Sequence, residues 1–218
     1  MTGKVRVGIV GTGRIGRVHT QTVRQRIPEA EVVAVTDINL TAAQQCAADF
    51  GIPTVAPNFG ALLDDPAIDA VLICSATDTH APYIIQAANA GKHIFCEKPI
   101  AADLAAIDSA LAAVSKAGVK LMIGFNRRFD SNHSRIKQAI ESGEIGTPQL
   151  LHIISRDPSP PPVSYVKVSG GMFFDMTIHD FDMARFLLGD VVEVYAVGGV
   201  MVDPAIGEAG DIDTAVIT

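Results

Sequence analysis

An acidic and a basic side chain lie four residues apart in the second half of the chain. Asp175 and His179 fall in a segment, 172–188, whose apolar pattern predicts a helix. Positions i and i+4 of a helix share one face, so the carboxylate can orient the imidazole and stabilise its protonated form. Such a pair can remove a proton from a hydroxyl group near neutral pH. A surface Asp–His pair without a catalytic function has the same pattern, and the pair taken alone favours that interpretation.

The same segment could instead bind a divalent metal ion, because Asp180 and Asp182 lie close to His179 in the sequence. A catalytic metal usually requires about three protein ligands and an open coordination position. The other histidines show no spacing that would complete such a set. They are His19, His80, His93, His133 and His152. Metal-dependent hydrolysis is therefore an alternative, and the sequence favours a site without a metal.

One lysine directly precedes a proline at the end of a short apolar segment. In the run Cys96-Glu97-Lys98-Pro99, the proline biases Lys98 towards an extended backbone and removes a backbone donor. A lysine amine held in one direction can hydrogen-bond a reacting oxygen and stabilise negative charge on it. It can also accept a proton if its pKa is lowered. A solvated loop lysine would fit this short sequence equally well.

A glycine-rich turn joins the first predicted strand to the first predicted helix. Gly11, Gly13 and Gly16 form Gly-x-Gly-x-x-Gly after the β-branched run 5–10, and a second strand ends in Asp37. The first glycine permits the tight turn, the second lets a pyrophosphate approach the backbone, and the third lets helix and strand pack closely. The helix N-terminus favours the phosphate charge, and Asp37 lies about 20 residues further on, where a ribose hydroxyl requires an acceptor. This context predicts a dinucleotide site.

The composition is that of a globular protein. Of the 218 residues, 48% are hydrophobic and 19% are charged, and the formal net charge is −7. This acidic balance argues against a nucleic-acid partner, which would require a basic face. No stretch approaches the ~20 apolar residues that a membrane helix requires, and the N-terminus lacks the pattern of a signal peptide. The scattered Cys46, Cys74 and Cys96 fit a reducing compartment, so we expect a cytoplasmic protein without a membrane partner.

Strand and helix patterns alternate through residues 1–124. The predicted strands are 4–10, 31–36, 54–55, 69–74, 93–96 and 120–124, and the predicted helices are 13–26, 41–50, 81–90 and 103–117. Near-continuous apolar strands that alternate with helices predict an α/β domain with a doubly wound parallel sheet. Ligands of such sheets bind beyond the carboxyl ends of the strands, where the glycine turn, Asp37 and Lys98 all fall.

The pattern changes after residue 124. Helices are predicted at 131–142 and 172–188, strands at 149–155, 191–202 and 213–218, and an exposed proline-rich loop at 157–162. This mixture predicts a second, α+β domain over 125–218. The last predicted strand reaches the final residue, so we expect that this domain is incomplete.

Four segments together make the chain resemble the glucose–fructose oxidoreductase, inositol dehydrogenase and rhizopine-catabolism (Gfo/Idh/MocA) oxidoreductases. They are Gly11-Thr12-Gly13-Arg14-Ile15-Gly16, Glu97-Lys98-Pro99, Gly124-Phe125-Asn126-Arg127-Arg128-Phe129-Asp130 and Asp175-x-x-x-His179-x-x-Asp182. Many dehydrogenases share the first motif, and the other three are much more specific. Within the family, the chain looks most like bacterial myo-inositol 2-dehydrogenases.

The resemblance implies an NAD-binding Rossmann domain followed by an α+β domain with a large open sheet that binds substrate and forms oligomers. It also implies that Lys98, Asp175 and His179 form the catalytic group, with Arg127 and Asp182 as substrate contacts. The implied cofactor contacts are Gly11, Gly13, Arg14, Ile15, Gly16, Asp37, Ser75, Thr77, His80 and Glu97. Asp37 has no arginine beside it to receive a 2′-phosphate, which favours NAD over NADP.

The residues and the resemblance together predict an NAD-dependent dehydrogenase of polyol catabolism. It would oxidise a secondary hydroxyl of a cyclic polyol to a ketone, as from myo-inositol to 2-keto-myo-inositol (scyllo-inosose). His179, oriented by Asp175, would take the hydroxyl proton while Lys98 hydrogen-bonds the same oxygen, and the sequence leaves open which of the two is the formal base. The alternatives are a dehydrogenase acting on scyllo-inositol, glucose or xylose, and a non-catalytic NAD-sensing regulator on the same scaffold.

The chain departs from the family in length. Family members continue well beyond 218 residues and usually form tetramers through the completed open sheet. We therefore expect a homotetramer for the full-length protein. We also expect instability or aggregation of 218 residues alone, because a half-built sheet leaves an unpaired edge and an uncovered face.

Overall fold

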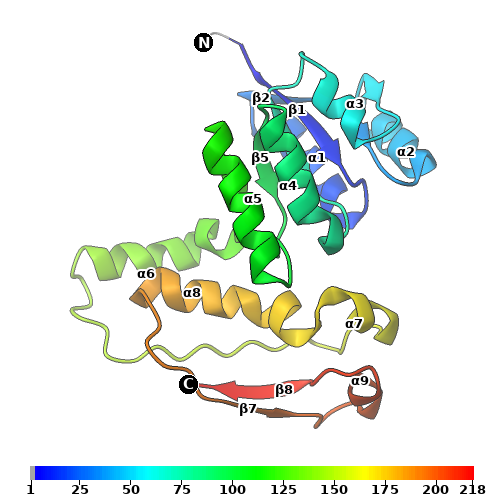
Figure 1. Cartoon of the computed structure of the whole chain (residues 1–218). Coiled ribbons are helices and arrows are strands. Elements are labelled where there is room, and N and C mark those ends of the chain that lie inside the picture. Colours follow the sequence, from blue (N-terminus) through cyan, green and yellow to red (C-terminus); the bar gives the residue numbers. More distant parts are fainter. Residues whose placement is uncertain (1–2) are drawn as a thin grey trace. The chain divides into compact units, whose positions relative to one another are not determined.

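The computed structural model describes residues 3–218, apart from the side chain of Val168. The chain forms two compact units, of which the first ends at Gly124 and the second begins at Phe125 (Figure 1). Each unit is described by itself. In the described part of the chain, no helix is both long and apolar enough to span a bilayer.

The first unit is built on one parallel sheet. Its six described strands are β1 (Val5–Val10), β2 (Ala30–Thr36), β3 (Thr54–Val55), β4 (Ala70–Ile73), β5 (His93–Cys96) and β6 (Leu121–Ile123). They lie in the order β3-β2-β1-β4-β5-β6, and every neighbouring pair is parallel. The strand order reverses between β1 and β4, which is the doubly wound Rossmann arrangement. The predicted fold class is thereby confirmed.

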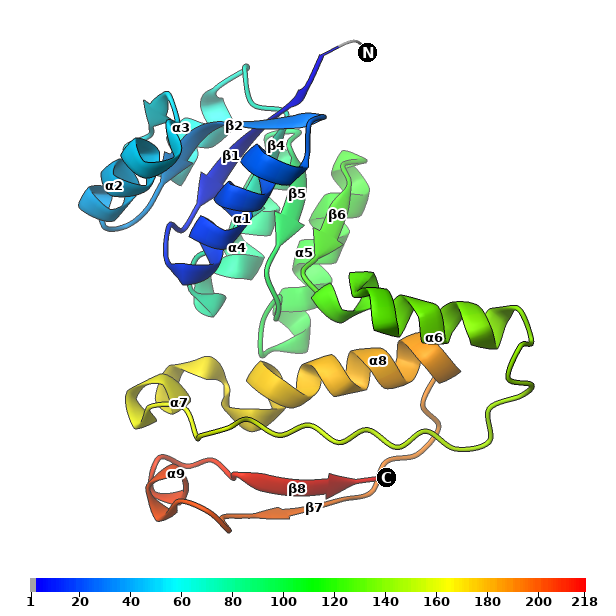
Figure 2. The ribbon, with the colours of Figure 1, turned by 180° about the vertical axis from the view of Figure 1, so that it is seen from behind.

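Helices cover both faces of this sheet. They are α1 (Arg14–Arg26), α2 (Leu40–Phe50), α3 (Phe59–Asp64), α4 (His80–Asn89) and α5 (Leu104–Ala117), with a short 3-10 helix, η1 (Thr77–Thr79), before α4. On one face, α1 and α2 pack around Ile9 and Val35. On the other, α3, α4 and α5 pack around Val71 and Ile84. Figures 1 and 2, seen from opposite sides, show α4 and α5 before the sheet in one view and α1 in the other.

The helix ends follow local sequence signals. The Asn39 side chain accepts hydrogen bonds from the first turn of α2, and Asp103 does the same for α5. Gly51 and Gly118 end these helices with φ values of 62° and 68°, in the left-handed region that favours glycine. These signals explain why both helices were predicted within one or two residues of their ends.

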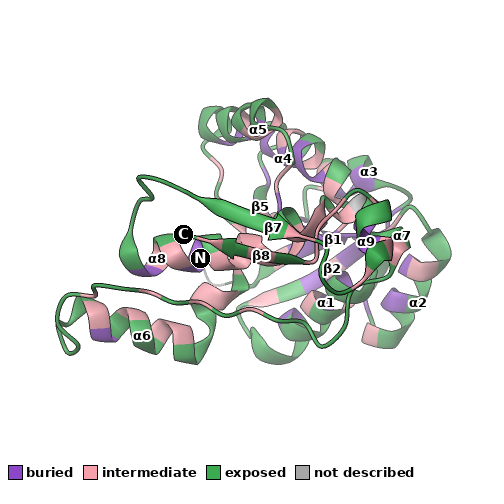
Figure 3. Cartoon of the chain, turned by 90° about the horizontal axis from the view of Figure 1, so that it is seen from below, coloured by how far each residue is buried: buried purple, intermediate pink, exposed green. Residues whose placement is uncertain are grey.

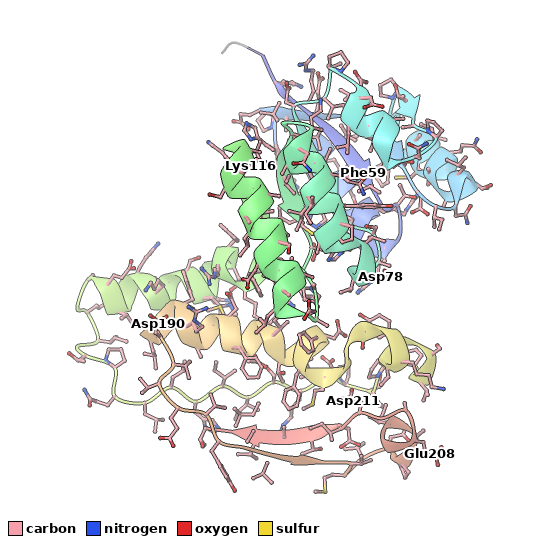
Figure 4. All side chains as sticks on the ribbon, viewed as in Figure 1. Phe59, Asp78, Lys116, Asp190, Glu208 and Asp211 are labelled. Carbon is pink, nitrogen blue, oxygen red and sulfur yellow. The ribbon has the colours of Figure 1, made fainter. Side chains whose placement is uncertain are left out.

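Helix α3 was not predicted from the sequence. Its six residues are too few to show a helical period, although Asn58 caps it by accepting from the Ala61 N–H at 3.0 Å. The helix is held by packing: Phe59 is 4% exposed and stacks on Tyr83 of α4 with ring centroids 4.3 Å apart (Figure 4). Tertiary contacts rather than periodicity therefore define this element.

The second unit combines helices with one small sheet. Its described elements are η2 (Asn126–Phe129), α6 (Ser131–Glu141), α7 (Val163–Ser169), the π-helical η3 (Phe173–Thr177), α8 (Ile178–Leu188), β7 (Ala196–Gly199), α9 (Pro204–Glu208) and β8 (Thr214–Ile217). Strands β7 and β8 are antiparallel, with Ala196 opposite Ile217. Helices α6 and α8 lie side by side in Figures 1 and 2.

Several predictions for the second unit were wrong. The segment 149–155 forms no strand. The two described strands of this unit, β7 and β8, pair with each other, and neither pairs with this segment. Of the predicted strand 191–202, only Ala196–Gly199 is a strand, opposite the four residues of β8, and Tyr195 exchanges backbone hydrogen bonds with Thr218 at its end. Helix α7 was not predicted. Figure 3 shows β7 mostly in the colour of exposed residues and β8 in alternating exposed and intermediate colours, and Val197 and Val216 are 55% and 69% exposed.

Candidate functional site

The turn after β1 has the backbone geometry that a pyrophosphate requires. Gly11 has a φ of 92°, and a Cβ atom there would lie 2.5 Å from the carbonyl carbon of Cys74. A Cβ atom on Gly16 would lie 1.9 Å from the carbonyl oxygen of Gly11. At Gly13, in contrast, a Cβ atom would meet no atom within 4 Å. Two of the glycines are therefore required by backbone packing, and the third leaves space in front of the loop.

The N-terminus of α1 opens onto this space. Gly13 is the N-cap residue and supplies no capping side chain, and the first turn holds no acidic residue. Arg14 and Ile15, which were predicted to contact the cofactor, form that first turn and are exposed. The N–H groups and the helix dipole can therefore act on a bound anion without competition from a carboxylate of this turn.

Asp37 is held against the glycine loop. Its Oδ2 atom accepts from the backbone N–H of Thr12 at 2.6 Å and from the Thr12 hydroxyl at 3.1 Å. Its Oδ1 atom accepts from the Asn39 N–H at 2.9 Å. Thr12 is only 3% exposed and was not singled out from the sequence, where its position between two glycines was the only signal. The predicted ribose acceptor thus has a fixed orientation.

The predicted second cofactor segment, 75–80, follows β4. The Ser75 hydroxyl bonds the Thr79 hydroxyl at 2.6 Å, and Thr77 begins the short helix η1 with Asp78 (Figure 4). His80 is 2% exposed, and its ring nitrogens lie 2.7 Å from the carbonyl oxygen of Pro99 and 3.0 Å from that of Ser75. Both ring nitrogens of His80 are occupied by backbone carbonyl oxygens. In this conformation, neither nitrogen is available to bond a phosphate or a ribose hydroxyl.

The Glu97-Lys98-Pro99 loop begins where β5 ends. The Glu97 carboxylate pairs with Nε2 of His19 on α1 at 2.6 Å, and Lys98 is half-buried. His19 lies three residues after Gly16, so both occupy the inner stripe of α1 that faces the sheet. That spacing indicated only that His19 faces the sheet and did not identify Glu97 as its partner, and the sequence had left the role of His19 open.

The strand register brings these first-unit residues to one edge of the sheet. Val10 pairs with Thr36 on one side and with Ile73 on the other, and Ile73 pairs with Cys96. The residues that follow these strands therefore emerge side by side. They are the glycine loop, Asp37, the 75–80 segment and the loop of Lys98, which is the predicted grouping at the carboxyl ends of the strands.

Cys74 and Cys96 lie at this edge without being nucleophiles. Burial, and to a smaller extent the charge of Glu97, raise the pKa of Cys74 to about 12. Burial also raises the pKa of Cys96. Thiolate chemistry requires the opposite shift, so these side chains act as small apolar groups.

In the second unit, Asp175 lies on the π-helical turn and His179 on the first turn of α8. The predicted helix 172–188 is therefore helical in extent but not uniformly α-helical, and the π turn changes the angle between the two side chains. The Tyr165 hydroxyl donates to Oδ1 of Asp175 at 3.0 Å. Asp211 accepts from the Met172 N–H at 2.9 Å and so holds the start of this segment (Figure 4). Nothing in the sequence indicated Tyr165 or Asp211.

The predicted substrate contacts are both engaged in ion pairs within the second unit. Nη1 of Arg127 pairs with Oδ1 of Asp180, which also accepts from the Ser155 hydroxyl at 2.6 Å. Nη2 of Arg128 donates to Oδ1 of Asp182 at 2.5 Å, and its Nε atom donates to Oδ2 at 2.9 Å. Asp182 is 9% exposed.

Among the residues that the structure describes, no three His, Cys, Asp or Glu side chains are grouped so as to hold a metal ion.

Two family descriptions match the chain. "Oxidoreductase family, NAD-binding Rossmann fold" matches residues 5–125, and "GFO/IDH/MocA C-terminal domain" matches residues 133–218. The chain belongs to the Gfo/Idh/MocA oxidoreductase family. Its first unit is the NAD-binding Rossmann domain of this family, as the glycine loop and the strand order had indicated.

Individual relatives are similar to this chain over almost its whole length. It is 52% identical over 219 residues to "Uncharacterized oxidoreductase YrbE" of Bacillus subtilis, covering 100% of this chain and 64% of the relative. It is 50% identical over 211 residues to "Inositol 2-dehydrogenase" of Rhizobium meliloti (96% and 63%). It is 47% identical over 214 residues to "Myo-inositol 2-dehydrogenase" of Thermotoga maritima (98% and 64%). The chain therefore spans slightly less than two thirds of the length of these relatives.

Solved structures give the same result. A putative myo-inositol dehydrogenase from Sinorhizobium meliloti has a TM-score of 0.94 and 49% identity, over 98% of this chain and 64% of that one. A scyllo-inositol dehydrogenase from Lactobacillus casei, with bound NAD(H) and scyllo-inositol, has a TM-score of 0.90 and 33% identity, over 98% and 65%.

Proposed function

We propose that the protein is an NAD-dependent dehydrogenase that oxidises a secondary hydroxyl of a cyclic polyol to a ketone. The proposed reaction is the conversion of myo-inositol to 2-keto-myo-inositol (scyllo-inosose), as a step of polyol catabolism. The observation that carries the proposal is the similarity of almost the whole chain to relatives named inositol 2-dehydrogenase, at 47% and 50% identity. The relative from Lactobacillus casei supports scyllo-inositol as a second candidate substrate.

The proposed cofactor site uses the edge of the first sheet. The open face of Gly13 and the exposed first turn of α1, with Arg14 and Ile15, suit a pyrophosphate. The oriented carboxylate of Asp37 suits a ribose diol and disfavours a 2′-phosphate. Ser75, Thr77 and Glu97 follow the neighbouring strands and are proposed as further contacts. Bound NAD would supply the nicotinamide ring that accepts a hydride.

The proposed chemistry requires a proton acceptor and a donor to the substrate oxygen. We assign proton removal from the hydroxyl to His179, with Asp175 orienting the imidazole and stabilising its charged form. The Tyr165 hydroxyl supports this role, because it fixes one oxygen of Asp175. Lys98 would hydrogen-bond the substrate oxygen and stabilise its negative charge as the hydride leaves.

The proposed substrate contacts are Arg127 and Asp182. A guanidinium carries five N–H donors, so Arg127 can bind Asp180 and a polyol hydroxyl at once. A carboxylate can accept from several donors, so Asp182 can keep its contact with Arg128 while it accepts from a hydroxyl. Ser155 lies beside Asp180 and belongs to the same group of polar side chains.

An NAD-reduction assay on the full-length protein tests the proposal directly. Myo-inositol, scyllo-inositol, glucose and xylose are compared, first with the parent and then with Lys98→Met and His179→Asn. We expect each substitution to lower kcat by about a hundredfold or more while the Kd for NAD changes little. Lys116→Met on α5 is a matched exposed control (Figure 4).

Other outcomes would change the assignment. Turnover that survives both substitutions would refute the catalytic roles. Tight NAD binding without NADH formation from any of the polyols would favour an NAD-sensing regulator on the same scaffold.

We infer further that the full-length protein is a cytoplasmic homotetramer that works on a small-molecule substrate, without a nucleic-acid or membrane partner. The three cysteines are all free and buried, which suits a reducing compartment. Light scattering on the full-length protein tests the tetramer.

A further inference from the structure

Both sequence neighbours of Lys98 are held by a histidine. Glu97, before it, bonds through its carboxylate to Nε2 of His19 at 2.6 Å. Pro99, after it, bonds through its carbonyl oxygen to Nδ1 of His80 at 2.7 Å. The two histidines come from different helices, α1 and α4, which cover opposite faces of the sheet. The loop that carries the lysine is therefore fixed from both sides.

His80 joins two loops at once. Its second ring nitrogen lies 3.0 Å from the carbonyl oxygen of Ser75, and the side chain is 2% exposed. Carbonyl oxygens only accept hydrogen bonds, so each of these contacts requires an N–H on the ring. The imidazolium form satisfies both contacts, and either neutral tautomer satisfies one. The His80 ring is thus built into the structure as a link between the end of β4 and the end of β5.

His19 fixes the other side of the loop. Its ring packs edge-on against Phe95 of β5, with centroids 5.0 Å apart and planes at 64°. The paired Glu97 carboxylate lies over Gly124, where a Cβ atom would come within 3.0 Å of its Oε2 atom. The Glu97 N–H also donates to the carbonyl oxygen of Ile73 at 3.0 Å. Side chain and backbone of Glu97 are both constrained, one residue before the lysine.

We propose that His19 and His80 are positioning residues for Lys98, because each anchors one neighbour of the lysine and together they fix the direction of its amine. The catalytic role of Lys98 in this statement rests on the proposed function. The physical reason for the device is that a misplacement of about 1 Å at a reacting group can cost about a hundredfold in rate. The same links tie the lysine loop to α1 and to the 75–80 segment, which carry the proposed cofactor contacts.

The proposal is tested on the full-length protein with paired variants of each histidine. His19→Leu removes the bond to Glu97, and His19→Gln retains an N–H that can reach it. His80→Leu and His80→Gln form the second pair. His133→Leu, at a half-buried histidine near the start of α6 whose ring bonds the Asp130 carboxylate at 3.0 Å, is the matched control. Hydrogen exchange of the backbone amides of the 97–101 loop, all but that of Pro99, is measured on each variant, together with the Kd for NAD and kcat and KM for the polyol.

We expect His19→Leu to accelerate exchange at 97–101 and to lower kcat about tenfold or more, with the Kd for NAD within about threefold of the parent. His19→Gln should restore most of both kcat and protection. His80→Gln should give an intermediate result, because the single amide nitrogen can take the position of only one of the two ring nitrogens that bond the loops. If His80→Leu does not fold, the His19 pair and His80→Gln still decide the question.

Two results would overturn the proposal. One is unchanged exchange and kcat in both His19→Leu and His80→Gln. The other is a large loss of NAD affinity with normal exchange, which would make the histidines direct cofactor contacts. The proposed function fails separately: if Lys98→Met keeps its turnover, Lys98 is not catalytic, whereas faster exchange at 97–101 in the histidine variants still shows that they position the loop.

Discussion

The backbone N–H of Thr12 donates to the carboxylate of Asp37 over 2.6 Å, so the end of β2 is tied to the glycine loop that follows β1. The Thr12 hydroxyl bonds the same oxygen, and the Asn39 N–H bonds the other. The Asp37 carboxylate is therefore held in one orientation before a ligand binds. A preorganised acceptor lowers the cost of ordering on binding, so this relationship bears on both the affinity and the choice of cofactor.

Asp37→Ser should weaken NAD binding by about tenfold or more and reduce the preference for NAD over NADP. The substitution removes an acceptor for the ribose and the negative charge that repels a 2′-phosphate. The ratio of kcat/KM for the two cofactors and calorimetric Kd values measure the effect. Asp64→Ser, at an exposed position at the end of α3, is the control. An unchanged ratio of kcat/KM for NAD and NADP would mean that Asp37 holds the glycine loop and does not contact the ribose.

Alanine substitutions at Gly13 and Gly16 should distinguish a glycine that NAD binding requires from one that the stability of the fold requires. Gly13 has a φ of −65° and open space in front of it, so Gly13→Ala should leave the free energy of unfolding within about 1 kcal/mol of the parent. Its methyl group would occupy the proposed pyrophosphate position and weaken NAD binding. Gly16→Ala places a Cβ atom 1.9 Å from the Gly11 carbonyl oxygen and should cost about 1–3 kcal/mol or more.

Urea unfolding and calorimetric NAD titration of both variants give the two quantities. Normal NAD binding by Gly13→Ala would show that the phosphates lie elsewhere. Normal stability of Gly16→Ala would show that α1 can move away from the loop without cost.

The ion pair of Arg128 and Asp182 should contribute to the stability of the second unit as well as to any contact with substrate. Asp182→Asn should lower the free energy of unfolding by about 1–3 kcal/mol, because it leaves the guanidinium beside a neutral partner. The low end is expected, since the Arg128 side chain is 40% exposed and stacks on Phe186 at 5.1 Å.

A double-mutant cycle with Arg128→Met isolates the pair. Urea unfolding of the two single variants and of the combined variant gives the coupling free energy. A coupling near zero, together with a raised KM in Asp182→Asn, would assign the carboxylate to substrate alone.

In the first unit, the features that depend on residues close together in the chain could be predicted from the sequence. The strand at 5–10, the three glycines and the helix after them are contiguous, and each has a steric reason that can be read without a structure. What it missed depends on contacts between distant residues. His19 and Glu97 lie 78 residues apart, and Arg128 and Asp182 lie 54 apart, so no periodicity reveals either pair.

The second unit was harder to predict for a related reason. The segment 149–155 alternates between exposed and half-buried residues as a strand would, but a strand exists only with a paired neighbour. The π-helical turn over Phe173–Thr177 adds one residue to a helical path, and a short apolar pattern carries no separate signal for such an insertion. Periodicity therefore found the helix and could not find the irregular turn within it.

Arg6 and Asp69 give a stability that should depend on pH in the acid range. Nε and Nη2 of Arg6 donate to the two carboxylate oxygens at 3.0 and 2.8 Å, and the Arg6 backbone N–H adds a third bond at 2.9 Å. The hydrogen bonds from the Arg6 side chain, followed by that from its backbone, lower the pKa of Asp69 to about 2. A carboxyl whose pKa is lower in the folded than in the unfolded chain stabilises the fold above its ordinary pKa. That stabilisation is lost as the pH falls from about 4 to about 2.

Arg6→Met should therefore lower the urea midpoint at neutral pH, and the gap to the parent should close as the pH falls through this window. The effect should be modest, because both side chains are about 40% exposed and solvent screens their interaction. Arg26→Met, at the end of α1, is the control and should show no such window. A gap that stays constant between about pH 7 and about pH 2 would mean that Arg6 stabilises the strand by packing along its aliphatic stem and not through the charge of Asp69.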